Sequence, residues 1–386
     1  MSLYTHLECH QCGQKYPKNE VHNYCHQCTQ PLLAKYNISP NTPKSIIQSD
    51  RYDMWRYSAL LPLEDDKNSI TLGEGWTPLL NIPKTADTLG IASVRMKEEG
   101  LNPTGSFKAR GIGMAVSKAK ELGIQSFCIP TAGNAGSALS AYVAAIGGEA
   151  HIYMPEATPR VFQLDCEVMG ANVTKVKGSI RDAGLAMNRD NVDGQWWDIT
   201  TLKEPFRLEG KKTMGYEIAE QLEWKLPDVI IYPTGGGTGL IGIWKAFQEM
   251  KEMGWVDNIP TRMVAVQTEG CNPVVEAFVG GLDHCNLCEN PEETMANGLR
   301  VPKAFGDKLI MKTIKESNGF ALDVTEEEMM ASIHEFGRME GIFLSPEGAA
   351  VYTGLKKLVV LEFIKPSDTV VLINTGSPYK YVDNML

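Results

Sequence analysis

Short apolar segments alternate with longer helical patterns through most of the chain. Segments rich in β-branched and aromatic residues predict strands at 93–97, 126–130, 151–155, 172–176, 228–233, 262–267 and 369–374. Between them, apolar residues recur at helical spacing, which predicts helices over 107–122, 134–146, 208–222 and 325–339. This alternation is typical of α/β layers around mostly parallel sheets. The region starts near Leu72, and its length allows one sheet with a second one inserted.

Residues 1–35 follow a different pattern. They are rich in Cys, His, Gln, Tyr and Lys and poor in aliphatic residues. A polar stretch that contains Pro and Ser follows, from Tyr36 to Asp50, and indicates a linker. We therefore expect a small N-terminal module ahead of the α/β region.

The composition narrows the classes of function. Hydrophobic residues make up 43% and charged residues 22%, and the formal net charge of −10 gives no general attraction to nucleic acid or anionic membranes. No apolar run approaches the roughly 18 residues that span a bilayer, and the start MSLYTHLECH does not resemble a secretion signal. Nine cysteines, an odd number, do not fit a disulfide framework. We expect a cytoplasmic protein whose partner is a small molecule, and neither nucleic acid nor a membrane.

Two CxxC pairs in the N-terminal module have the spacing of a zinc site. Cys9 and Cys12 form the first pair, and Cys25 and Cys28 follow after a gap of twelve residues. Four thiolates close a tetrahedral site with no open position, so the zinc is expected to be structural. A segment with so few aliphatic residues would gain folding energy from the metal. The alternative is four ordinary free cysteines.

Other candidate ligands lie near these pairs or further along the chain. The histidines of the module are interpreted as surface residues, namely His6, His10, His22 and His26. The pair Cys285 and Cys288 has no matching second pair, so we expect loop or partly buried thiols there.

A lysine stands at a predicted helix start. In GLNPTGSFKARG (100–111), turn and cap residues precede Lys108. The positive end of the helix dipole favours a neutral amine at this position. Schiff-base chemistry requires a neutral amine. The alternative is a solvated surface charge.

Three loops follow predicted strands. TAGNAGSA (131–138) opens a helix of small residues, whose free N–H groups are suited to a carboxylate. TGGGTG (234–239) is neither a P-loop nor a dinucleotide fingerprint, and it suits one phosphate monoester. NTGS (374–377) places a hydroxyl at a strand end, where it can face a pocket. For each loop, a plain structural turn is the alternative.

The combination and order of these segments resemble the fold-type-II enzymes that use pyridoxal 5'-phosphate (PLP). That group contains tryptophan synthase β, threonine dehydratase and threonine synthase, and the resemblance covers residues 72–380. Within the group, the chain looks most like threonine synthase in four segments, GEGWTPL (73–79), EGLNPTGSFK (99–108), FRLEGKKT (206–213) and NTGS. A zinc-ribbon-like segment also occurs in some threonine synthase-like proteins. The implied organisation is a zinc-ribbon-like module at 1–35, a large PLP domain at 36–105 and 206–386, and a small inserted α/β domain at 106–205.

The resemblance also implies roles for single residues. Lys108 would carry PLP as a Schiff base and then transfer protons. Asn134 would bind the phenolic oxygen of the cofactor, and Thr375 would face its pyridine nitrogen. The cofactor phosphate would be held by Gly235, Gly236, Gly237 and Thr238. The substrate α-carboxylate would be bound by Thr131, Ala132 and Gly133. Arg207 would bind the substrate phosphate, because a guanidinium matches phosphate oxygens.

The implied activity is conversion of O-phospho-L-homoserine and water to L-threonine and phosphate, by an enzyme that is usually a homodimer. Three features depart from the threonine synthase pattern: Ala109 stands where Asp is common, Pro378 where glycine is usual, and SPEGAA (345–350) where EPASAA is more common. The alternatives are a threonine or serine dehydratase or another β-replacement enzyme. A different class also remains open, in which a zinc-ribbon regulatory protein uses an inactive catalytic scaffold.

Overall fold

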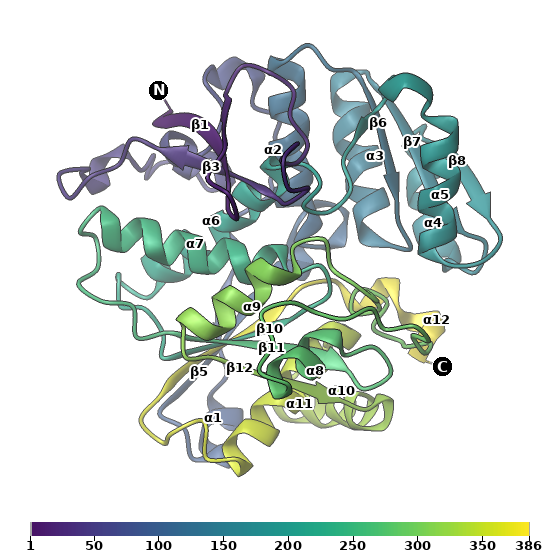
Figure 1. Cartoon of the computed structure of the whole chain (residues 1–386). Helices are drawn as coiled ribbons and strands as arrows, with labels where there is room; N and C mark the ends of the chain where they lie inside the picture. The colour runs from purple at the N-terminus through teal and green to yellow at the C-terminus, as the bar shows by residue number, and fades with distance from the viewer. Residues whose placement is uncertain (1, 386) are drawn as a thin grey trace. The chain divides into compact units, whose positions relative to one another are not determined.

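The computed structural model describes residues 2–385. The chain forms two compact units (Figure 1). Unit 1 comprises Met1–Trp76, Asn102–Thr104 and Lys108–Thr213, and unit 2 comprises Thr77–Leu101, Gly105–Phe107 and Met214–Leu386. The three-part division implied by the resemblance stays a prediction.

Unit 1 contains a small antiparallel sheet and a larger parallel one. The antiparallel sheet has the order β2-β1-β3, formed by β1 (Tyr4–Cys9), β2 (Lys15–Pro17) and β3 (Leu32–Tyr36). The parallel sheet has the order β8-β7-β6-β9, formed by β6 (Ser126–Pro130), β7 (Glu149–Pro155), β8 (Asn172–Val176) and β9 (Trp197–Asp198). The helices are α2 (Lys108–Glu121), α3 (Asn134–Ile146), α4 (Arg160–Val168), α5 (Ile180–Asp190) and the first half of α6 (Phe206–Gln221).

One large hydrophobic core joins the N-terminal module to the rest of unit 1, and a smaller separate cluster around Cys128, Tyr153 and Met187 lies at α5. The buried residues Tyr4, Leu7 and Leu32 of the small antiparallel sheet belong to the same cluster as those of α2, α3 and the parallel sheet. The cluster extends to Trp197, Ile199 and Phe206. The N-terminal module therefore has no separate core, which agrees with its poverty in aliphatic residues.

Unit 2 is built on one six-stranded sheet. Its order is β12-β11-β10-β13-β5-β4, from β4 (Leu79–Asn81), β5 (Ser93–Glu98), β10 (Val229–Pro233), β11 (Arg262–Thr268), β12 (Phe320–Val324) and β13 (Thr369–Asn374). Only the edge strand β4 pairs antiparallel among these strands. The central strand β10 is buried along its whole length, as expected for a parallel strand with both faces covered.

In unit 2, one or two helices separate most consecutive strands of the sheet. The helices of this unit are α1 (Pro83–Leu89), α7 (Thr238–Glu252), α8 (Pro273–Val279), α9 (Asp307–Glu316), α10 (Glu326–Glu340), α11 (Pro346–Val360) and α12 (Val382–Met385). Short 3-10 helices lie in both units at Lys44–Ile46, Met54–Leu60, Asp66–Asn68, Glu99–Leu101, Pro103–Gly105, Val192–Gly194 and Pro378–Lys380. Local signals set several helix ends, such as the capping box of Thr325 and Glu328 that opens α10.

The predicted α/β architecture with mostly parallel sheets is confirmed. Each of the seven predicted strands is present, and four of the observed helices correspond to the predicted ones. The sequence pattern missed the three strands of the N-terminal module, the short strands β4 and β9, and β12, a segment FALDV in which an Asp interrupts the apolar run.

Candidate active site and metal centre

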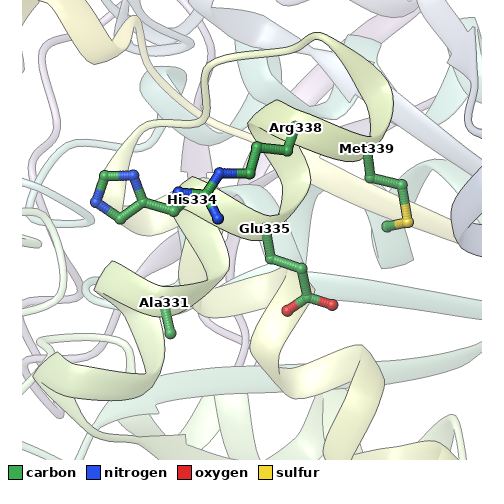
Figure 2. Close-up of a pocket in the computed structure, with 5 residues that line it drawn as sticks. All are labelled: Ala331, His334, Glu335, Arg338 and Met339. Carbon is green, nitrogen blue, oxygen red and sulfur yellow. The ribbon is translucent and has the colours of Figure 1, made fainter.

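A hollow in the surface of unit 2 lies along α10 and is lined by Ala331, His334, Glu335, Arg338 and Met339 (Figure 2). These side chains all project from one helix, and His334, Glu335 and Arg338 are exposed. None of the residues singled out by the sequence lines this hollow, so it is not the candidate site.

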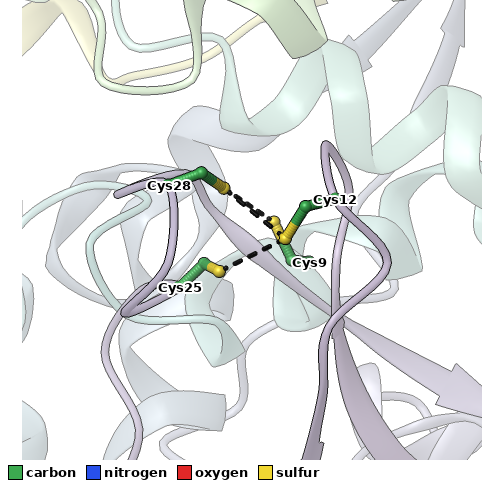
Figure 3. A group of neighbouring side chains, drawn as sticks. All are labelled: Cys9, Cys12, Cys25 and Cys28. Atoms are coloured by element: carbon green, nitrogen blue, oxygen red, sulfur yellow. Dashed lines mark hydrogen bonds between the residues drawn. The ribbon is translucent and has the colours of Figure 1, made fainter.

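The four cysteines of the N-terminal module converge (Figure 3). Their sulfur atoms all lie within 4.8 Å of one another. The Sγ atoms of Cys9 and Cys28 are 3.4 Å apart, and that of Cys12 is 3.6 Å from Cys25 and 3.7 Å from Cys28. A tetrahedral zinc with bonds of about 2.3 Å sets its sulfurs about 3.8 Å apart. The cluster therefore fits the predicted zinc.

The histidines near the cluster are not all on the surface. His26 is exposed, as predicted, but His22 is buried, which corrects the expectation that it is a surface residue. The reason is that the loop between β2 and β3 folds back on Tyr16, whose ring centroid lies 5.0 Å from that of His22. Burial lowers the pKa of His22.

Cys285 and Cys288 lie in a loop, as the sequence analysis predicted. Cys285 is buried and Cys288 is partly buried, which agrees with the prediction. Among the described residues, the four N-terminal cysteines are the group of side chains arranged to bind a metal ion.

Lys108 is the first residue of α2, as the turn and cap residues predicted. Helix α2 is crossed closely by α6, and each helix has a glycine at the contact. A Cβ atom on Gly111 would lie 2.7 Å from the Arg207 carbonyl oxygen, and one on Gly210 would lie 2.1 Å from the Arg110 carbonyl oxygen. Any larger residue would force the two helices apart.

This crossing gathers basic groups within unit 1. The side chain of Lys211 lies against Gly111, since a Cβ atom added there would be 2.9 Å from its Cε. The amine of Lys211 also interacts electrostatically with that of Lys108. Burial, together with the nearby Lys108, lowers the pKa of Lys211 well below its ordinary value. Arg207 and Lys211 are both fully buried.

Arg207 has unused hydrogen-bonding capacity. Its Nη1 donates to the Ile199 carbonyl oxygen over 2.6 Å, while its Nε and Nη2 have no hydrogen-bond partner. Glu204 accepts the backbone N–H groups of Phe206 and Arg207 over 2.7 and 3.1 Å. Burial raises the pKa of Glu204 to about 7, and the Arg207 charge opposes this rise. The complete burial of Arg207 excludes a surface ion pair.

The predicted carboxylate loop lies at the carboxyl end of β6. The Thr131 hydroxyl accepts the Gly133 N–H over 3.2 Å, and α3 begins at Asn134 without a side-chain cap. Because β6 pairs in parallel with β9, this loop and the segment that leads to Arg207 leave the same edge of the sheet. The uncapped N–H groups of α3 are suited to an anion.

The glycine loop of unit 2 follows β10. Helix α7 begins at Thr238 after Gly237, which has a φ of 74°, and no side chain caps it. A Cβ atom on Gly235 would lie 2.2 Å from the Gly298 carbonyl oxygen. This loop is thus a glycine cradle at an uncapped helix start, which fits a phosphate group.

Thr375 follows β13 at the same edge of the unit 2 sheet, because β10 pairs in parallel with β13. Its carbonyl oxygen accepts the N–H of Phe107 over 3.1 Å, and Phe107 directly precedes Lys108 in the chain. Next to it, Asn374 Nδ2 donates to both carboxylate oxygens of Glu98 over 2.9 and 2.8 Å. Burial raises the pKa of Glu98 to about 7.

The predicted residues are divided between the two units. Lys108, Thr131, Ala132, Gly133, Asn134 and Arg207 belong to unit 1, and Gly235, Gly236, Gly237, Thr238 and Thr375 belong to unit 2. The sequence reasoning missed Lys211 and Glu98. Lys211 lies four residues after Arg207, so the one-turn spacing on a helix was a usable signal. Glu98 had no such signal, because its partner Asn374 is distant in the chain.

The model of a family described as pyridoxal-phosphate dependent enzyme matches residues 70–376, and the chain belongs to this family. The N-terminal cysteine cluster lies outside the matched residues.

Within this family the chain is threonine synthase-like. It is 36% identical to the threonine synthase of Methanosarcina acetivorans, over 96% of this chain and 91% of that protein. It is 34% identical to that of Methanocaldococcus jannaschii, over 97% of this chain and 93% of the relative.

Solved structures support the fold. Threonine deaminase isoform 2 from Solanum lycopersicum superimposes with a TM-score of 0.68 at 21% identity, over 80% of this chain and 86% of that chain. Between residues 2 and 385, no helix has the length and apolar character needed to cross a membrane. The homodimer and the cytoplasmic location stay predictions.

Proposed function

We propose that the protein converts O-phospho-L-homoserine and water to L-threonine and phosphate, with PLP carried by Lys108. The observation that carries the proposal is the buried guanidinium of Arg207, which keeps two nitrogens without hydrogen-bond partners. A fully buried cation with open donors is stabilised by an anion, and a guanidinium matches phosphate. The names of the two relatives favour the same reaction.

When bound, PLP supplies an electron sink for negative charge that develops on the substrate. The amine of Lys108 would move protons at the substrate Cα and Cβ, and water would add at Cβ. The N–H groups of residues 131–133 and the start of α3 would hold the α-carboxylate. Arg207 would bind the phosphate that leaves Cγ. The neutral hydroxyl of Thr375 would suit elimination and replacement.

A second candidate is dehydration of serine or threonine. Ala109, which is fully buried, stands where threonine synthases commonly carry Asp, and this departure favours a different substrate. Dehydration needs no site for a substrate phosphate, so the environment of Arg207 discriminates between the two reactions.

One assay tests the choice of reaction. The purified PLP-loaded enzyme is given O-phosphohomoserine, and phosphate and threonine are measured together. Equal amounts of the two products support the proposal. Release of ammonia from serine or threonine at a higher rate, with no threonine from O-phosphohomoserine, would reject it.

A separate measurement tests the cofactor lysine. Borohydride reduction followed by peptide mapping should place the phosphopyridoxyl group on Lys108. Lys108→Ala should lose the visible Schiff-base absorbance. A label on Lys97, Lys118 or Lys211 would reject the assignment.

A further inference from the structure

We propose that the four-cysteine module positions Arg207, through the side chain of Asn23. The module would thus be a positioning element for the anion site as well as a stabilising appendage. This inference rests on the proposed function for the role of Arg207, but the contacts that carry it lie within unit 1.

Asn23 connects the cysteine cluster to strand β9. It lies two residues before Cys25 in the chain. Its Nδ2 donates to the Asp198 carbonyl oxygen over 2.9 Å, and its Oδ1 accepts the indole N–H of Trp197 over 3.0 Å. A single amide therefore binds both residues of β9, one through the backbone and one through the side chain.

Strand β9 leads directly to the guanidinium. The next residue, Ile199, provides the carbonyl oxygen that accepts from Arg207 Nη1 over 2.6 Å. The ring of Trp197 also contacts that of Phe206, the residue before Arg207, with centroids 6.1 Å apart. Any shift of β9 therefore moves the hydrogen-bond acceptor that orients Arg207.

A second connection reaches helix α6 itself. Tyr36, the last residue of β3, donates its hydroxyl to Glu209 Oε2 over 2.7 Å. Lys212 bonds the same carboxylate over 2.6 Å, and its amine lies 4.0 Å from the centroid of the Tyr36 ring. The end of β3 thus contacts α6 two residues after Arg207, while Asn23 of the module contacts the strand before it.

A metal at the cysteines would fix the position of Asn23. Cys25 is buried, and two backbone bonds hold it in its turn, from its own N–H to Gln30 and from the Thr29 N–H to its carbonyl oxygen. With Cys25 bound to the metal, Asn23 has little freedom, because one residue separates them. Loss of the metal would free this segment and weaken the two hydrogen bonds by which Asn23 holds β9.

The test compares Asn23→Ala with Asn19→Ala in the full-length, PLP-loaded enzyme. Asn19 lies in the same loop, is exposed and serves as a matched amide control. Hydrogen exchange, zinc content and the KM for O-phosphohomoserine and for serine are measured. Asn23→Asp is included because its carboxylate can still accept from Trp197 but cannot donate to Asp198.

The expected result is local. Asn23→Ala should keep its zinc and its cofactor absorbance, and exchange in residues 197–207 should be faster than in the wild type or in Asn19→Ala. Its KM for O-phosphohomoserine should rise about tenfold, the size of one misplaced charge-assisted contact, with that for serine unchanged. Asn23→Asp should show a smaller change, and removal of zinc with a chelator should accelerate exchange in the same residues.

Two outcomes would overturn the inference. The first is unchanged exchange in residues 197–207. The second is acceleration spread evenly over unit 1, including α5, which would mean general stabilisation. The proposed function is judged separately. If exchange changes as expected but Arg207→Ala leaves every KM unchanged, the positioning contact stands and the substrate role of Arg207 fails.

Discussion

Lys211 lies one helical turn beyond Arg207 on α6, and both side chains are fully buried. Two basic side chains one turn apart in a protein interior face the same side of the helix. Glu204 interacts with both side chains, and burial together with the neighbouring positive charges lowers the pKa of the Lys211 amine. This arrangement supports the proposal that the start of α6 binds an anion.

Replacement of Arg207 tests that site directly. Arg207→Ala should raise the KM for O-phosphohomoserine roughly ten- to a hundredfold, because a charge-assisted contact is worth about 1.5–3 kcal/mol. Slow dehydration of serine should barely change. Arg207→Lys keeps the charge but loses the two-pronged set of N–H donors. Its KM for O-phosphohomoserine should lie between those of the wild type and of Arg207→Ala. Equal losses on both substrates would indicate a role in the fold or in cofactor binding.

Lys211 should show a conflict between stability and binding. Because its folded-state pKa is lowered, the unfolded chain binds more protons between that value and about 10.4, and stability rises with pH across this window. Lys211→Met should therefore stabilise the protein at pH 7, with a gain that shrinks as the pH approaches 10. Urea unfolding at several pH values measures this. The KM for O-phosphohomoserine should rise in the same variant. A gain that is constant across pH 7–10 would contradict the lowered pKa.

The glycine crossing of α2 and α6 should tolerate no side chain. Gly210→Ala places a Cβ 2.1 Å from a backbone oxygen, and overpacking of this kind costs about 1–3 kcal/mol. Gly184→Ala, in α5 of the same unit, meets nothing closer than 3.7 Å. That control should be neutral or stabilise by about 0.5–1 kcal/mol, the usual helix preference for alanine. Thermal unfolding compares the two, and equal effects would show that the crossing is looser than described.

Glu98 should make stability depend on pH. Its folded-state pKa is raised from 4.5 to about 7, so the folded protein binds more protons between these values and becomes less stable as the pH rises through them. The difference corresponds to about 3 kcal/mol, at about 1.4 kcal/mol for each unit. Glu98→Gln cannot titrate and should make this part of the stability curve less steep, with the remaining slope due to Glu204, whose pKa is also raised to about 7. An unchanged slope between pH 4.5 and 7 would place the titration elsewhere.

Local sequence patterns predicted the regular elements well. The strands at 126–130, 172–176 and 369–374 and the helix at 134–146 match the structure to the residue, because apolar runs there end at Gly, Pro or polar turn residues. These patterns depend on neighbours in the chain. The candidate loops could be found for the same reason, since each directly follows a strand.

Contacts between distant residues could not be predicted in this way. The bond of Asn23 to Asp198 and that of Asn374 to Glu98 join residues far apart in the sequence, and neither end carries a local signal. The burial of His22 depends on the fold of its loop over Tyr16. The position of Lys211 one helical turn after Arg207 could be predicted from the sequence. Its burial could not, because it depends on the close glycine contact between α2 and α6.

The shared core of unit 1 has a consequence for the order of events during synthesis. The apolar side chains of the cysteine module pack in one cluster with residues as late as Phe206. At ordinary translation rates, that residue emerges on the order of ten seconds after the module. During that interval, metal bound by the cysteines would give the nascent end a fixed local structure. The module would then provide a preformed surface against which strand β9 and helix α6 can pack.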